Sequence, residues 1–164
     1  MGVMFSGGEI LDVAVQIERN GHKFYTELQK TAKDQRVQEL AAYLADQELH
    51  HFRDFEALRD RLGDFQPSWE SYTGEYEAYV RALAEGHIFG DPASKELLNK
   101  ATGEEEALCM AMGFERDSIL FYSEMSNLVP ERERGAVEEL TEQEKEHLRK
   151  LAEILRELRK GEKR

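Results

Sequence analysis

Four stretches in which apolar residues recur at helical spacing constrain the fold more than any other feature of this chain. They cover residues 8–31, 35–62, 102–127 and 130–159. A helix of 25 residues is about 40 Å long, and only a few residues separate the first stretch from the second and the third from the fourth. Each pair therefore predicts an antiparallel hairpin. Because a connection of 40 residues, 63–102, joins the hairpins, the sequence predicts an all-α four-helix bundle with a long crossover.

Local signals set the expected ends of these helices. Asp34 is a plausible helix N-cap, and Gly63 is the start of a stop signal. Thr102 and Glu105 fit a capping box at the start of the third long helix. Within the connection we expect two short helices, one over about 70–85 and one that starts at Asp91 and Pro92. The interpretation is a single domain over 1–164, with hairpin 1 at about 8–62, the connection at 63–102 and hairpin 2 at about 103–159.

The composition excludes several classes of function. Lys and Arg total 22 against 34 Asp and Glu, and this formal charge of −12 argues against binding to nucleic acid or to an anionic membrane. The single cysteine, Cys109, excludes an intramolecular disulfide, a four-cysteine zinc site and a rubredoxin-type iron centre within these residues. We expect Cys109 to be a small buried hydrophobe. With no apolar span and no export signal, the expected location is the reducing cytoplasm.

The two predicted hairpins repeat each other, and the repeated residues include polar ones. Residues 44–62 and 140–158 share six of nineteen positions at an offset of 96, among them a glutamine, a glutamate and a histidine. Upstream, each half carries a Phe-Tyr pair, and a glutamate lies seven residues before the tyrosine of that pair. These residues recur in the second half 97 positions later. A duplicated core repeats apolar positions, whereas solvent-facing polar residues need not match. The repeated glutamates and histidines therefore indicate a shared chemical role.

Each half of the repeat supplies one glutamate on its first helix and Glu-x-x-His on its second. Positions i and i+3 lie about 60° apart on one helix face, so both side chains of each Glu-x-x-His motif can point to one spot. Four buried carboxylates would repel one another, and two divalent cations cancel their charge. Mixed oxygen and nitrogen ligands suit Fe²⁺ or Mn²⁺, and Zn²⁺ is not excluded. The predicted metal ligands are Glu18, Glu48, His51, Glu115, Glu144 and His147.

The residues around this set have more ordinary interpretations beside functional ones. Tyr25 and Tyr122 are either amphipathic core residues or phenols that hydrogen-bond to a ligand carboxylate. His22 lies four residues after Glu18 and is expected to pack near the site rather than to bind metal. His50 is expected to face solvent because it lies about 160° around the helix from Glu48. His87, in the connection, is also expected to face solvent.

The pattern resembles the ferritin-like superfamily, and within it the rubrerythrin-like di-iron proteins. The resemblance covers both hairpins and implies a ferritin-like bundle in which two irons react with O2 or peroxide. It also implies that Glu48 and Glu144 bridge the irons and that Glu18 and Glu115 are terminal. The residues that carry it are Glu18 with Phe24-Tyr25, Glu48 with His51, Glu115 with Phe121-Tyr122, and Glu144 with His147.

The sequence also departs from the rubrerythrin-like pattern. Typical members have a further glutamate three residues from the third-helix ligand, where this chain has Met112 and Ser118. The missing cysteine-ligated domain implies that electrons come from an external electron-transfer protein. Bacterioferritins have a haem-binding methionine after the second-helix glutamate, and Leu49 at that position predicts no haem. Classical ferritins lack the fourth-helix histidine that His147 supplies.

Three hypotheses for function follow. The first is a non-haem di-iron oxidoreductase, peroxidase-like or oxidase-like, that reacts with O2 or peroxide. The second is a ferroxidase that feeds iron storage or transfer, and the third is a metal-free acidic helical protein that binds other proteins. A homodimer or higher homo-oligomer is expected, because aromatic residues of the connection offer apolar surface: Trp69, Tyr72, Tyr76 and Tyr79.

Overall fold

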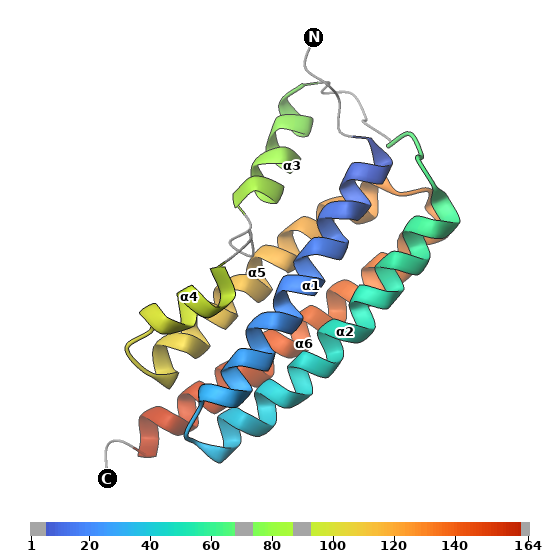
Figure 1. The fold of residues 1–164 in the computed structure, drawn as a ribbon. Coiled ribbons are helices and arrows are strands. Elements are labelled where there is room, and N and C mark those ends of the chain that lie inside the picture. The colour runs from blue at the N-terminus through green and yellow to red at the C-terminus, as the bar shows by residue number, and fades with distance from the viewer. Residues whose placement is uncertain (1–5, 68–73, 87–92, 162–164) are drawn as a thin grey trace.

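The computed structural model describes residues 6–67, 74–86 and 93–161, and within these ranges it contains six helices (Figure 1). They are α1 (Gly7–Thr31), α2 (Gln35–Leu62), α3 (Glu75–Gly86), α4 (Ala93–Lys100), α5 (Glu104–Leu128) and α6 (Glu131–Gly161). The predicted all-α fold is confirmed. No helix in the described part of the chain is both long enough and apolar enough to cross a membrane.

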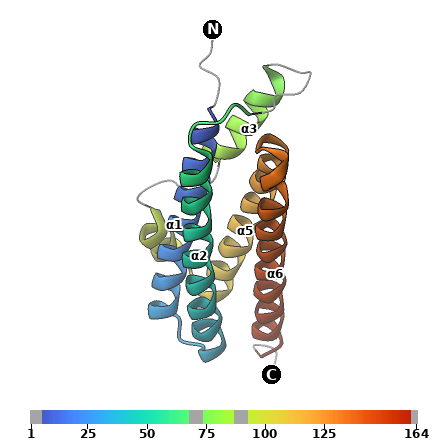
Figure 2. The same ribbon diagram turned by 90° about the vertical axis from the view of Figure 1, so that its right-hand side faces the viewer.

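The four long helices form a bundle of two antiparallel hairpins (Figures 1 and 2). Helix α1 packs mainly on α2, and α5 packs mainly on α6. The short helices α3 and α4 lie outside this bundle, where α3 contacts α5 and α4 contacts α1. The two described helices of the connection thus pack on different hairpins, α3 on the second and α4 on the first.

Local capping explains where the helices of the first hairpin begin and end. Ser6 caps α1, and its side chain and that of Glu9 form a reciprocal capping box. The Asp34 side chain accepts a hydrogen bond from the Arg36 backbone N–H at the start of α2, which confirms the predicted cap. Helix α2 ends at Leu62, and its C-cap is Gly63, whose φ of 58° lies in the region that favours glycine.

The predicted capping box at Thr102 is wrong. Helix α5 begins at Glu104, with Gly103 as its N-cap and no side-chain cap. Thr102 donates from its backbone N–H and its hydroxyl to the carboxylate of Glu106 instead. The Glu104 carboxylate accepts from the backbone N–H groups of Lys33 and Asp34, so α5 satisfies backbone donors of the turn between α1 and α2.

The predicted helices of the connection are present, with one shifted boundary. The helix expected over 70–85 is α3, which begins at Glu75. Helix α4 follows the expected start, although Asp91 and Pro92 themselves lie outside the described residues. Of the four aromatic residues expected to support self-association, Trp69 and Tyr72 also lie outside the described residues. Tyr79 is 44% exposed, and self-association stays a prediction.

Aromatic side chains join the two hairpins in the core. Phe24 of α1 meets Phe114 of α5 edge-on, with ring centroids 5.0 Å apart. Phe55 of α2 lies 4.9 Å from Tyr122 of α5, also between ring centroids. All four rings are buried, and such pairs contribute beyond their buried area. This packing fixes the distance between the hairpins, and therefore the distance between the polar side chains that they supply.

Candidate metal centre

The six predicted ligands lie together in the middle of the bundle and are almost inaccessible to solvent. None of them is more than 3% exposed, although four are glutamates and two are histidines. Each long helix contributes: Glu18 comes from α1, Glu48 and His51 from α2, Glu115 from α5, and Glu144 and His147 from α6. Charged residues are rarely buried to this extent unless they are paired or bind a metal.

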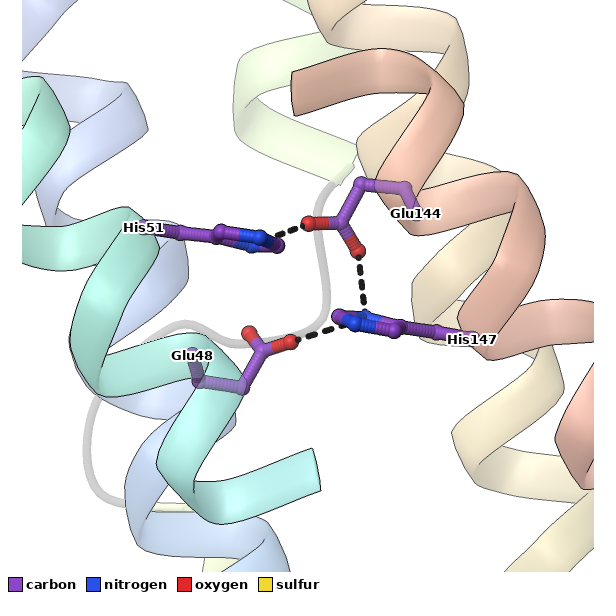
Figure 3. A group of neighbouring side chains, drawn as sticks. All are labelled: Glu48, His51, Glu144 and His147. Carbon is purple, nitrogen blue, oxygen red and sulfur yellow. Dashed lines mark ion pairs between the residues drawn. The ribbon is translucent and has the colours of Figure 1, made fainter. Parts of the chain in front are cut away.

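Four of these residues form the centre of the site (Figure 3). Glu144 lies between the two histidines, with one oxygen 2.7 Å from His51 Nδ1 and the other 3.3 Å from His147 Nδ1. Glu48 Oε1 is 3.4 Å from His147 Nδ1. One potential ligand atom from each of the four residues can be chosen so that all lie within 4.8 Å of one another. This grouping brings oxygen and nitrogen ligands close enough together to hold a metal ion.

The remaining two glutamates flank this centre, one from each hairpin. Glu18 Oε2 lies 3.5 Å from His51 Nδ1, and Glu115 Oε2 lies 3.8 Å from His147 Nδ1. The two imidazole rings are stacked, with centroids 5.3 Å apart and planes 16° from parallel. His51 thus faces carboxylates from α1 and α6, and His147 faces carboxylates from α2, α5 and its own helix α6. The duplicated sequence produces a pseudo-twofold arrangement in three dimensions.

Two buried tyrosines connect the hairpins through this arrangement. Tyr25 of α1 donates its hydroxyl proton to Glu115 of α5, and Tyr122 of α5 donates to Glu18 of α1. Burial first, and the neighbouring carboxylates second, raise the pKa of both phenols, so they stay protonated and able to donate. Of the two interpretations considered for these tyrosines, the structure shows the hydrogen bond to a carboxylate.

Burial and like charge raise the pKa of three of the four carboxyl groups. For Glu115, burial and the charge of Glu144 raise it to about 8, and the pKa values of Glu18 and Glu48 also rise. Burial would by itself raise the pKa of Glu144 as well, but its contacts with Glu115 and both histidines lower it. Glu144 is therefore the exception among the four carboxyl groups, because it lies between two imidazoles.

Contacts with the carboxylates raise the pKa of both histidines. Burial opposes the charged form of His51, but the carboxylates of Glu144 and Glu18 outweigh it and raise its pKa to about 12. Glu115, Glu144 and Glu48 raise the pKa of His147 in the same way. Without a metal, protons on the imidazoles and on some carboxyls therefore compensate the buried negative charge. Metal binding must displace those protons.

A metal fits these residues because several of their buried atoms make no hydrogen bond within the described chain. Six buried atoms of the site make no hydrogen bond within the described chain: Glu18 Oε2, Glu48 Oε1, His51 Nδ1, Glu144 Oε1, and both ring nitrogens of His147. His51 Nδ1 and Glu144 Oε1 are close but are not aligned as donor and acceptor. Buried polar atoms are normally satisfied, and converging carboxylate and imidazole atoms without hydrogen bonds can bind a cation once their protons leave.

Of the other residues considered in the sequence, two lie as expected and one does not. His22 Nδ1 lies 2.8 Å from the carbonyl oxygen of Ala45, so His22 packs α1 on α2, as expected. His50 is exposed and 3.5 Å from Asp46, also as expected, while His87 lies outside the described residues. Cys109 was expected to be buried and is exposed. Its Sγ is 4.0 Å from Arg159 at the surface.

Comparison with known proteins identifies the family. The family model for rubrerythrin matches residues 9–155, which is most of the chain. The chain belongs to the rubrerythrin family. It is also similar to a Thermotoga maritima crystal structure described as a ferritin-like diiron-carboxylate protein. The two are 28% identical, the match covers 96% of this chain and 99% of the other, and the TM-score is 0.68. No curated protein matches the chain.

This rubrerythrin-family chain therefore combines the family's fold with a buried Glu/His group of di-metal type. Its site also depends on residues whose role was missed in the sequence. A Cβ atom at Gly21 would lie 2.2 Å from Glu48 Oε2, so glycine leaves room for that carboxylate. Gln143 Oε1 lies 2.9 Å from His51 Nε2. The signal for Gln143 was present, since the glutamine is shared by both copies of the repeat, but no role was assigned to it.

Proposed function

We propose that this rubrerythrin-family protein is a di-iron oxidoreductase that reacts with O2 or peroxide. The observation that carries the proposal is the pseudo-twofold set of two glutamates and two Glu-x-x-His motifs, buried and left with unpaired lone pairs. Membership in the family and similarity to a diiron-carboxylate protein favour iron over manganese or zinc. Two irons at this site would supply the redox chemistry.

The chain's own residues would divide the work of holding such a centre. Glu48 and Glu144, whose oxygens lie 3.4 and 3.3 Å from His147 Nδ1, would hold the two ions together with the histidines. Glu18 and Glu115, each fixed by a tyrosine from the other hairpin, would supply the remaining carboxylate ligands. Because both carboxylates are oriented by buried hydrogen bonds, little reorganisation is needed when metal enters.

The protein surrounding the centre would control protons and water. Burial of all six side chains excludes bulk water, which strengthens electrostatic interactions at the site. Carboxyl groups with raised pKa values, such as Glu115 at about 8, can release protons when cations enter. We propose an external electron-transfer protein as the source of electrons, since one cysteine cannot form a four-cysteine iron centre within these 164 residues.

The proposal is tested by anaerobic loading with Fe²⁺, followed by exposure to hydrogen peroxide or O2. We expect two irons per chain by elemental analysis, and iron oxidation by either reagent in stopped-flow absorbance. His147→Ala should lower the iron content, whereas the matched variant His50→Ala should not, because His50 faces solvent. Iron uptake that continues well beyond two per chain would favour the storage alternative. Absence of bound iron in the wild type would refute the proposal.

A further inference from the structure

The pseudo-twofold symmetry of the site breaks at the outer nitrogens of the two histidines. His51 Nε2, which points away from the carboxylates, lies 2.9 Å from Gln143 Oε1. The equivalent atom, His147 Nε2, is buried and makes no hydrogen bond within the part of the chain that the structure describes. Gln47 is the counterpart of Gln143 in the sequence repeat, yet it does not satisfy His147. The sequence duplication therefore predicts a symmetry that the side chains do not have.

Two consecutive residues of α6 hold the His51 ring of α2. Gln143 Oε1 can only accept, so His51 Nε2 must carry a proton and donate it. Glu144 Oε1 lies 2.7 Å from Nδ1 of the same ring. Together these contacts define which ring nitrogen faces the carboxylates, namely Nδ1.

The His147 ring is held differently, by packing. The ring meets that of Tyr43 edge-on, with centroids 6.3 Å apart and planes at 86°. The ammonium group of Lys150 lies 5.3 Å from the centroid of that tyrosine ring. The tyrosine is 41% exposed, so a partly exposed aromatic ring packs against His147, whereas His51 donates a hydrogen bond to Gln143. Among the described residues, no hydrogen bond at His147 Nε2 orients this ring in the way that Gln143 orients His51.

A histidine binds a metal through an unprotonated nitrogen, and the hydrogen bond at the other nitrogen decides which one is free. We propose that Gln143 is a positioning residue that keeps His51 Nδ1 directed at the carboxylates and makes the His51 half the tighter of two metal positions. The inference rests on the proposed di-metal centre. It predicts that the metal position at His51 fills before the one at His147, an order that the symmetric sequence repeat does not predict.

The first arm of the test needs no metal. In the metal-free full-length protein, long-range ¹H–¹⁵N NMR should show one slowly exchanging imidazole Nε2–H, assigned to His51. Gln143→Leu should abolish its protection from exchange, and the matched variant Gln47→Leu should leave it intact. Gln143→Glu retains an acceptor oxygen at the same chain length and should preserve it. Equal protection in the wild type and in Gln143→Leu would overturn the positioning role.

The second arm measures Fe²⁺ binding by anaerobic calorimetry in the same variants. The wild type should bind two Fe²⁺ ions in resolved steps, and Gln143→Leu should weaken the tighter step by about 10- to 100-fold, the range typical of partners that orient metal-binding histidines. Gln47→Leu should bind as the wild type does. If both proteins bind two ions and the affinities in Gln143→Leu equal those in the wild type, this inference alone is overturned. No binding by the wild type would overturn the proposed function and, with it, this inference.

Discussion

Replacement of Tyr122 by phenylalanine isolates one of the two hydrogen bonds that join the hairpins through the site. The ring is fully buried and packs on Phe55 with centroids 4.9 Å apart, so phenylalanine retains the packing and loses only the hydroxyl. That hydroxyl donates to Glu18, whose second oxygen already lacks a hydrogen bond among the described residues. A buried hydrogen bond to a charged group is worth about 1.5–3 kcal/mol, and we expect about 2 kcal/mol of destabilisation for Tyr122→Phe.

Urea unfolding of the metal-free protein measures this loss directly. With a slope of about 2 kcal/mol per molar urea, typical for small proteins, a loss of about 2 kcal/mol lowers the midpoint by about 1 M. The matched control is Tyr76→Phe, because Tyr76 of α3 also donates to a carboxylate, that of Glu124 at 2.5 Å, but in a partly exposed position. We expect its midpoint to change by less than half as much. If both variants lose the same stability, the buried tyrosine–carboxylate pairs are not specifically stabilising and the reasoning is refuted.

Three further predictions concern the site. His147→Ala should reduce bound metal measured by elemental analysis, while His50→Ala should match the wild type; a larger loss in His50→Ala would contradict the face assignment. In the metal-free protein the pKa of Glu115 is raised to about 8, so the folded state holds a proton that the unfolded state releases near its ordinary value of 4.5. The stability from this group is complete below that value and is lost as pH rises through about 8; melting temperatures measured with chelator should therefore fall between pH 5 and 9. Metal-loaded protein should not show this fall, and a chelated protein that melts identically across this range would disprove the raised value. Gly21→Ala should displace the Glu48 carboxylate, which would lie 2.2 Å from the new Cβ, and weaken metal binding measured by calorimetry. Gly113→Ala has no neighbour within 4 Å and should keep wild-type affinity while gaining up to about 1 kcal/mol of helix stability; equal metal affinity in the two variants would count against a role for Gly21.

Local sequence information was sufficient for the helices and for the composition of the site. Asp34 and Gly63 set the boundaries of α2 through contacts within a few residues of themselves, and helical spacing alone puts Glu48 and His51 on one face. The duplication then doubled this information, because a glutamate or histidine that recurs in register indicates a common role. The resemblance to rubrerythrin-like proteins rested on those same residues, and the family match confirms it.

The arrangement between helices was decided only by the tertiary structure. Thr102 and Glu105 match a capping box, but Glu104 instead reaches the turn between α1 and α2, where unpaired backbone N–H groups compete for a carboxylate. In the same way, spacing within one helix shows only that a tyrosine and a glutamate of that helix lie on the same face. Yet Tyr25 and Tyr122 each donate to the opposite hairpin.

Side-chain environments that involve two or more helices differ even where the sequence repeats. Gln47 and Gln143 occupy equivalent positions, but only Gln143 reaches a histidine, and Tyr43 packs beside His147 on one side of the site. Cysteine is a residue type that is often buried, but Cys109 lies at the surface near Arg159. Periodicity specifies which residues share a helix face, because that follows from the rise and turn of one backbone. The rotation and distance between helices depend on packing of side chains far apart in the sequence, and these determine which atoms meet.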